Sequence, residues 1–116
     1  MQYLLLIYSN EATEAAMSEA ERGEVYQRYM TFTQEIVSAG QFKAGDALQP
    51  TSTATTVRVK GGQTMTTDGP FAETKEQLGG YYLVEASDLD EAVSIAARIP
   101  SAEHGCVEVR PIMSFD

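Results

Sequence analysis

The opening segment MQYLLLIYSN, residues 1–10, limits the folds that the chain can adopt. From residue 3 to residue 8 both alternating sets of side chains are apolar, and a strand with this pattern is normally covered on both faces. We therefore predict a strand over residues 3–8 that lies inside the protein. Its two faces are Tyr3, Leu5 and Ile7 on one side, and Leu4, Leu6 and Tyr8 on the other.

Two helices are predicted from capping residues and apolar stripes. Ser18 and Glu21 form an S-x-x-E capping box, and Gly40 supplies the stop of this first helix. Asp88 begins the second helix, and Pro100 lies just past its end. The expected buried stripes are Val25, Tyr29, Phe32 and Ile36 in the first helix, and Leu89, Ala92, Val93 and Ala96 in the second.

Further strands are indicated by alternation and by β-branched residues. Residues 53–60, TATTVRVK, and the following QTMTT form a hairpin around the double glycine at 61–62. Residues 80–86, GYYLVEA, and residues 106–113, CVEVRPIM, are predicted as two more strands. Between the first helix and the hairpin, QFKAGDALQP is expected to form a short extended piece.

This order of elements predicts a ferredoxin-like α+β sandwich with an inserted β-hairpin, formed as one domain by residues 1–116. Each strand–helix–strand crossover is right-handed, so both helices pack on one face of the sheet. The other face is still apolar along residues 3–8 and 81–84, and no element is left to cover it. We therefore expect a homodimer whose sheets stack face to face, a dimeric α/β barrel.

The composition argues against several classes of partner. The net charge is −9, and the eight basic residues are scattered, which disfavours direct binding to nucleic acid or to an anionic membrane surface. No apolar run approaches the roughly 18 residues of a membrane span. The N-terminus has no basic region of the kind found in signal peptides. The single cysteine, Cys106, cannot form an internal disulfide, so we expect a cytoplasmic location.

Four stretches together resemble the DGPF-domain branch of the YCII-related family. They are MQYLLLIYSNEA, LQPTSTATTVRVKGG, DGPFAETKEQLGGYYLVEA and VEVRPI, and they cover almost the whole chain. The resemblance implies a dimeric α+β barrel on the ferredoxin-like fold, with no settled biochemical function. It also implies an association with sigma-factor pathways, which rests on gene neighbourhood.

The wider family is similar to muconolactone isomerase-like barrels, for which a His–Asp pair has been proposed. The aspartate of that pair matches Asp68, within the D-G-P-F turn. The histidine would lie on the first helix, but the sequence there is RYMTFTQE. His104 lies outside any family motif, so the pair is incomplete in this sequence.

Asp68 has two interpretations that are compatible with each other. Its carboxylate can accept from backbone amides two residues further on, in an Asx-type turn before Gly69 and Pro70. Alternatively, Asp68 is a general base or a substrate anchor at the mouth of a dimer cavity. Phe71 is expected to be buried and to fix this loop to the core.

Three further residues are candidate ligand contacts, each with a structural alternative. Lys75 lies in the run AETKEQ, which is either a solvated loop or a site that pairs with a carboxylate or an anionic ligand. Tyr82 and its neighbour Tyr81 point to opposite faces, either as core residues or with one phenol in the cavity. Arg110, with Glu108, is either an ion pair across the dimer or an anchor for a carboxylate.

The sequence indicates no metal site and no organic cofactor. His104 has no His or Cys at a zinc-ligand spacing, so we expect an exposed loop histidine. Cys106 has no recognisable activating base, and no phosphate-binding or dinucleotide-binding motif occurs.

Two hypotheses for function follow. The first is a homodimeric module that binds a small acidic or cyclic molecule or acts in regulation, and the incomplete His–Asp pair favours it. The second is a cofactor-independent enzyme that uses Asp68 for proton transfer in the dimer cavity, with Arg110 as an anchor.

Overall fold

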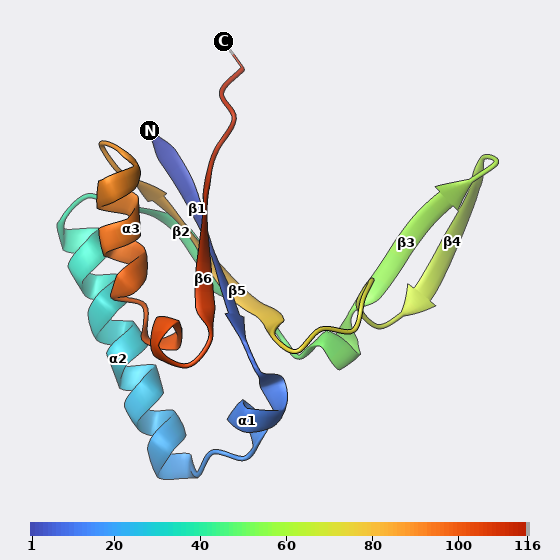
Figure 1. Ribbon diagram of the computed structural model, residues 1–116, viewed down its shortest axis with the longest axis horizontal. Coiled ribbons are helices and arrows are strands. Elements are labelled where there is room, and N and C mark those ends of the chain that lie inside the picture. Colours follow the sequence, from blue (N-terminus) through green and yellow to red (C-terminus); the bar gives the residue numbers. More distant parts are fainter. Residues whose placement is uncertain (116) are drawn as a thin grey trace.

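The computed structural model describes residues 1–115 of the chain as a mixed α+β fold with antiparallel strands (Figure 1). The predicted α+β class is therefore confirmed. In chain order the elements are β1 (Gln2–Ser9), α1 (Glu11–Ala15), α2 (Glu19–Ser38), β2 (Phe42–Ala47), η1 (Thr51–Thr53), β3 (Thr55–Lys60), β4 (Gln63–Asp68), β5 (Gln77–Glu85), α3 (Leu89–Ala97), η2 (Pro100–Glu103) and β6 (Cys106–Pro111).

Four of the strands form one sheet in the order β2-β5-β1-β6. β1 is central, and its residue Leu5 lies opposite Tyr82 of β5 and Val109 of β6. The face of β1 that carries Leu5 is buried, whereas Leu4, Leu6 and Tyr8 on the other face are half-buried.

The core lies between the sheet and the two long helices. Leu5 and Val84 are 0% exposed, and they cluster with Ile36 of α2 and Ile95 of α3. Since helix residues contact the same side of β1 that carries Leu5, α2 and α3 cover one face of the sheet (Figure 1). The prediction that both helices pack on one face is confirmed.

The helix boundaries follow the predicted capping residues. Ser18 Oγ accepts from the Glu21 backbone N–H at 3.2 Å, and a Glu21 carboxylate oxygen accepts from the Ser18 N–H at 3.1 Å. Asp88 accepts from the Glu91 N–H at 2.9 Å. Gly40, just after α2, has a φ of 75°, which glycine adopts without the strain of a side chain.

One prediction about α3 is wrong. Leu89 and Val93 are 52% and 49% exposed, so the helix turns a different stripe toward the core. Ile95 is buried instead, together with the two alanines of the predicted stripe, and Ile99, just past the end of the helix, is buried as well. The predicted and observed stripes overlap, and the face carrying Ile95 buries more apolar surface.

The β3–β4 hairpin forms a separate two-stranded sheet that projects from the rest of the protein (Figure 1). Gly61 and Gly62, with φ of 55° and 79°, make the predicted tight turn. We call residues 55–68 the arm and the remaining structure the body. With the arm, the chain has a radius of gyration of 16.2 Å, whereas a compact chain of this length has roughly 13 Å. The molecule is therefore extended.

Among residues 1–115 no helix is long and apolar enough to cross a membrane.

Candidate functional site

Among residues 1–115, no helix or strand covers the face of the four-stranded sheet that points away from α2 and α3. We call it the open face. Its centre is formed by half-buried apolar side chains, and its edges carry polar ones. Its central residues are Leu4, Leu6 and Tyr8 of β1 with Tyr81 and Leu83 of β5, and its flanking residues are Asp46 of β2 with Cys106, Glu108 and Arg110 of β6.

Strand register gives the open face its order. One row runs across the sheet from Asp46 through Tyr81 and Leu6 to Glu108. The neighbouring row passes through Leu4, which lies opposite both Leu83 and Arg110. The open face thus has an apolar centre with an acid at one edge and an acid and a base at the other.

The polar group at the β2 edge is a hydrogen-bonded pair. Tyr81 Oη donates to a carboxylate oxygen of Asp46 at 2.7 Å. This bond and the negative charge of Asp46 raise the pKa of the Tyr81 phenol above its ordinary value. At neutral pH the phenol is therefore a fixed donor, and the second carboxylate oxygen of Asp46 remains an acceptor.

The opposite edge carries an ion pair within one strand. Arg110 Nε donates to Glu108 Oε2 at 2.7 Å, and the Arg110 side chain is 66% exposed. Both residues have the orientation predicted for them, since Val107 and Val109 pack against the core on the other side. An exposed pair of this kind stabilises the fold little, which leaves the guanidinium able to meet another carboxylate.

Cys106 lies on the same edge strand, and its surroundings disfavour the thiolate. Its Sγ donates to a carboxylate oxygen of Glu76 at 3.7 Å. Desolvation, followed by the negative charge of Glu76, raises the pKa of the Cys106 thiol. The thiolate is therefore scarce at neutral pH, in keeping with the absence of an activating base noted in the sequence.

Asp68 is the last residue of β4, and its side chain is exposed. Within residues 1–115 its carboxylate accepts no hydrogen bond, and the residue two positions on is Pro70, which has no N–H. The Asx-turn interpretation is therefore wrong. The turn is held through the backbone, because the Gly69 N–H donates to Ala54 O at 2.7 Å and Thr56 Oγ1 donates to Gly69 O at 2.8 Å.

The prediction for Phe71 is also wrong. The side chain is 80% exposed in the single chain, on the connection between the arm and β5. The reason is topological, because this connection runs away from the helices that cover the core (Figure 1). Lys75 lies on the same connection and is exposed, which agrees with a solvated charge run.

Tyr82 lies in the core, under α2. Its Oη and Thr33 Oγ1 are 2.7 Å apart, and its ring packs edge-to-face on Phe32 with centroids 5.2 Å apart. The two tyrosines do point to opposite faces, as predicted. The one on the open face is Tyr81, whereas Tyr82, the candidate named from the sequence, lies under α2.

The four residues singled out from the sequence do not meet in one chain. Asp68 is on the arm and Lys75 is on its connection, whereas Arg110 is on the far edge strand and Tyr82 is in the core. The sequence analysis missed the pairing of Asp46 with Tyr81. Only the register between β2 and β5 reveals it, although an acid in the extended piece QFKAGDALQP could have been noted as a candidate.

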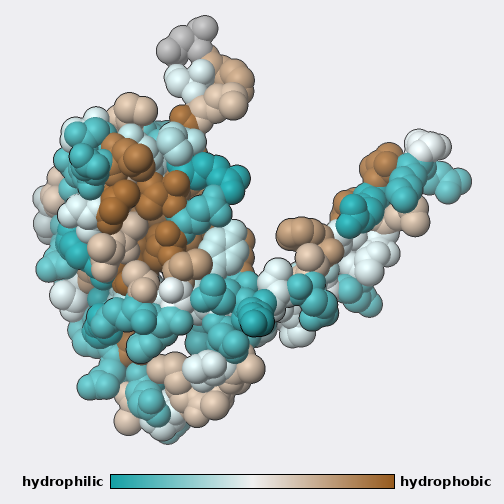
Figure 2. Space-filling model, viewed as in Figure 1, coloured by the Kyte–Doolittle hydropathy of each residue, from teal (hydrophilic) through white to brown (hydrophobic). Residues whose placement is uncertain are grey.

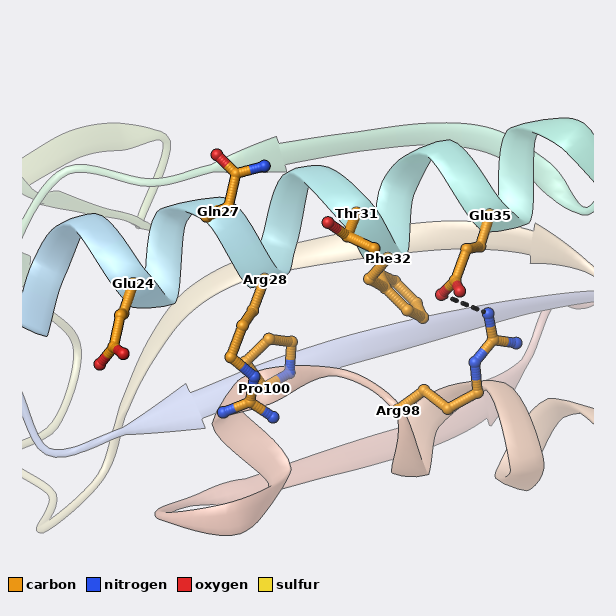
Figure 3. A pocket seen from close by; sticks show the side chains of 8 residues that line it. All are labelled: Glu24, Gln27, Arg28, Thr31, Phe32, Glu35, Arg98 and Pro100. Carbon is orange, nitrogen blue, oxygen red and sulfur yellow. Dashed lines mark hydrogen bonds and ion pairs between the residues drawn. The ribbon is translucent and has the colours of Figure 1, made fainter.

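Apart from the open face, the protein has a hollow on the helix side, between α2 and the segment that follows α3 (Figure 3). It has a volume of about 600 Å³. Arg98 donates to Glu35 at 3.1 Å and lies 5.5 Å from the centre of the Phe32 ring, while Arg28 pairs with Glu103. Both arginines are thus paired with carboxylates at the surface.

Two other observations bear on metal and proton chemistry. In the described part of the chain, no three His, Cys, Asp or Glu side chains are grouped so that they could hold a metal ion. His104 is exposed after η2, as predicted, and its backbone N–H donates to Ser101 O at 3.2 Å.

Comparison with known proteins identifies relatives over the full length. The family model described as YCII-related domain matches residues 1–116. An uncharacterized protein of Rhizobium meliloti (strain 1021) is 40% identical over 117 residues, which covers 99% of this chain and 94% of that protein. The match extends over the body and the arm alike.

Proposed function

The chain belongs to the YCII-related family, and from that premise we propose that it is a homodimeric module that binds a small molecule between two stacked sheets. In this proposal residues 1–116 form one domain with a ferredoxin-like fold, and two copies make a dimeric α/β barrel. The observation that carries the proposal is the open face, an apolar surface whose edges bear polar groups.

The strand order supports the proposed fold and dimer. An antiparallel sheet in the order β2-β5-β1-β6, with two helices on one face, is the arrangement of a ferredoxin-like sandwich. A sheet with Leu4, Leu6 and Leu83 on its uncovered face gains free energy by burying them. A second copy offers the same surface, and a two-fold axis makes the contact self-complementary.

The polar edges support a ligand of particular chemistry. The Arg110 guanidinium suits a carboxylate, because its planar fork can make two parallel hydrogen bonds. Asp46 and Tyr81 suit a hydroxyl group, because the second carboxylate oxygen of Asp46 is an acceptor and Tyr81 Oη, whose proton goes to Asp46, can accept as well. The apolar centre between them suits a small ring. We therefore propose a small acidic or cyclic molecule as the ligand, with Asp68 and Lys75 contributing from the arm and its connection.

The proposal includes a cytoplasmic location and a regulatory role. The single cysteine, Cys106, supports the location, since a lone thiol suits a reducing compartment. The regulatory role beside sigma factors rests on the family resemblance.

The experiment combines sedimentation with a thermal-shift screen of small carboxylates, lactones and phenols. We expect a dimer, and we expect a hit whose stabilisation is lost in Arg110→Gln while Arg22→Gln, a change of an exposed arginine on α2, retains it. A full chain that stays monomeric would overturn the dimer. A dimer in which no compound distinguishes Arg110→Gln from Arg22→Gln would overturn the ligand site.

A proton-transfer enzyme that uses Asp68 is the second candidate function. The observation that favours it is the Asp68 carboxylate itself, which accepts no hydrogen bond within residues 1–115 and so is available to a substrate. Asp68→Asn keeps the size of the side chain and removes its charge. If Asp68 is a base, the variant binds the screened compound and fails to exchange its acidic proton with D₂O, as followed by NMR. Equal exchange by both proteins would rule this function out.

A further inference from the structure

The arm is an insertion that the four-stranded sheet does not require. β2 and β5 are antiparallel neighbours, with Ala47 opposite Gly80, and a short turn could join them. Residues 48–76 intervene instead. Long connections of this kind in small domains usually have a function of their own.

The arm is not held in place by its own chain. Every residue of β3 and β4 is exposed except Thr56, and the two strands form a sheet only with each other (Figure 1). An isolated two-stranded hairpin is marginally stable in water. The arm therefore needs a surface outside its own body to become firmly structured.

One face of the arm is suited to such a surface. Val57 and Val59 point to the same side of β3, opposite Thr66 and Thr64 of β4. The two valines are 59% and 65% exposed. Hydrophobic residues are visible on the surface of the arm in Figure 2. A β-branched face of this kind is normally half-buried, since strands favour these residues where they pack against a neighbour.

The charge of the arm differs from that of the body. Two of the eight basic residues, Arg58 and Lys60, lie in the arm, and one of the 17 acidic residues, Asp68, lies at its end. The arm therefore has a net charge of +1, and the remaining residues, with six basic and 16 acidic side chains, have −10. Arg58 and Lys60 lie on the face of β3 opposite to Val57 and Val59. Their charge therefore attracts the arm as a whole toward an acidic body, and a second copy supplies such a body.

We propose that the arm docks on a second copy of this chain, with Val57 and Val59 facing it, so that the two copies exchange arms. This inference rests on the proposed homodimer and extends its interface beyond the open face. It also brings Asp68 and the exposed Phe71 to the other copy. Each ligand site is then completed by the partner, which explains how Asp68 can serve a site whose other groups lie on the sheet.

Two variants test the exchange by sedimentation equilibrium. In the first, residues 56–67 are replaced by Asn-Gly, which suits a two-residue turn because Thr55 and Asp68 lie opposite each other. In the second, Val57→Thr and Val59→Thr are combined, since threonine keeps the β-branched shape and strand preference while adding a hydroxyl. The matched control is Val37→Thr, a valine 53% exposed on α2.

We expect both arm variants to raise the dimer dissociation constant about tenfold or more, with Val37→Thr unchanged. Circular dichroism and thermal unfolding serve as the control, and we expect each variant to keep the fold of the body. A dimer whose dissociation constant is the same in all variants would overturn the arm exchange and leave the homodimer standing. The arm would then dock on a different protein. A full chain that is monomeric at every concentration would overturn both.

Salt gives an independent readout. Arg58→Gln with Lys60→Gln removes the positive charge of the arm and leaves the two valines in place. We expect this variant to weaken the dimer at low ionic strength, and we expect its dissociation constant to approach that of the unchanged chain as salt screens the attraction of the arm. An unchanged salt dependence would contradict docking on an acidic second copy.

Discussion

Leu5 in β1 and Val59 in β3 are both apolar side chains on antiparallel strands, but Leu5 is 0% exposed and Val59 is 65% exposed. Leu5 is covered by helices from its own chain. Val59 belongs to an arm that no other element of residues 1–115 covers. The body is thus stabilised by its own core, whereas the arm has the residues of a packed strand without the packing.

This difference shows where the chain needs a partner. The body buries one face of its sheet and leaves the open face half-buried, so it can fold alone and still gain from association. The arm gains almost nothing from its own chain. The two regions are therefore expected to respond differently to mutation and to dilution.

The largest contrast is expected between two alanine substitutions. Leu5→Ala removes a fully buried side chain and should lower the free energy of unfolding by about 2–5 kcal/mol. Val59→Ala, measured at a concentration where the chain is monomeric, should change it by less than about 0.5 kcal/mol. Urea denaturation of both variants checks the pair. Equal losses would mean that the arm packs on its own body.

A smaller effect is expected from the cap of α2. Ser18→Ala removes the side-chain acceptor for the Glu21 N–H and should cost about 0.5–2 kcal/mol of unfolding free energy. Ser18→Asp keeps an acceptor at this position and serves as the control. Because the cap belongs to the body, the loss should be the same above and below the dimer dissociation constant. A loss seen only in the dimer would place this helix end at the interface.

The smallest effect concerns the pH dependence of the open face. The hydrogen bond to Asp46 raises the pKa of Tyr81, so its stabilisation is present below about pH 10, the ordinary value, and is lost as pH rises past the folded value. NMR titration of labelled tyrosines, assigned with Tyr81→Phe, should give a midpoint above that value. Asp46→Asn should lower the midpoint, and dilution to the monomer should lower it as well if a second copy desolvates the phenol. A midpoint that is indifferent to both changes would contradict the assigned bond.

Much of the secondary structure could be predicted from sequence because its signals are local or periodic. The capping box at Ser18, the turn at residues 61–62 and the two apolar faces of residues 3–8 are each visible in a short window. The α3 stripe was misjudged because two overlapping stripes of a short helix both look apolar, and only packing decides between them.

The candidate site was harder to predict because it depends on register and on the course of long connections. Asp46 and Tyr81 are 35 positions apart in sequence and meet only through strand pairing. Phe71 follows a proline in a well-defined turn, which suggested burial, but the direction of the arm takes it away from the core. No local pattern contains that direction.

Hydrogen exchange of the backbone amides, followed by NMR or mass spectrometry above and below the dimer dissociation constant, tests the central claim most directly. The account predicts that amides of β1 and β5 stay protected at both concentrations. It predicts that amides of the arm, residues 55–68, are protected in the dimer and exchange rapidly on dilution. Arm amides that exchange at the same rate at both concentrations, whether fast or slow, would contradict the claim that a second copy holds the arm.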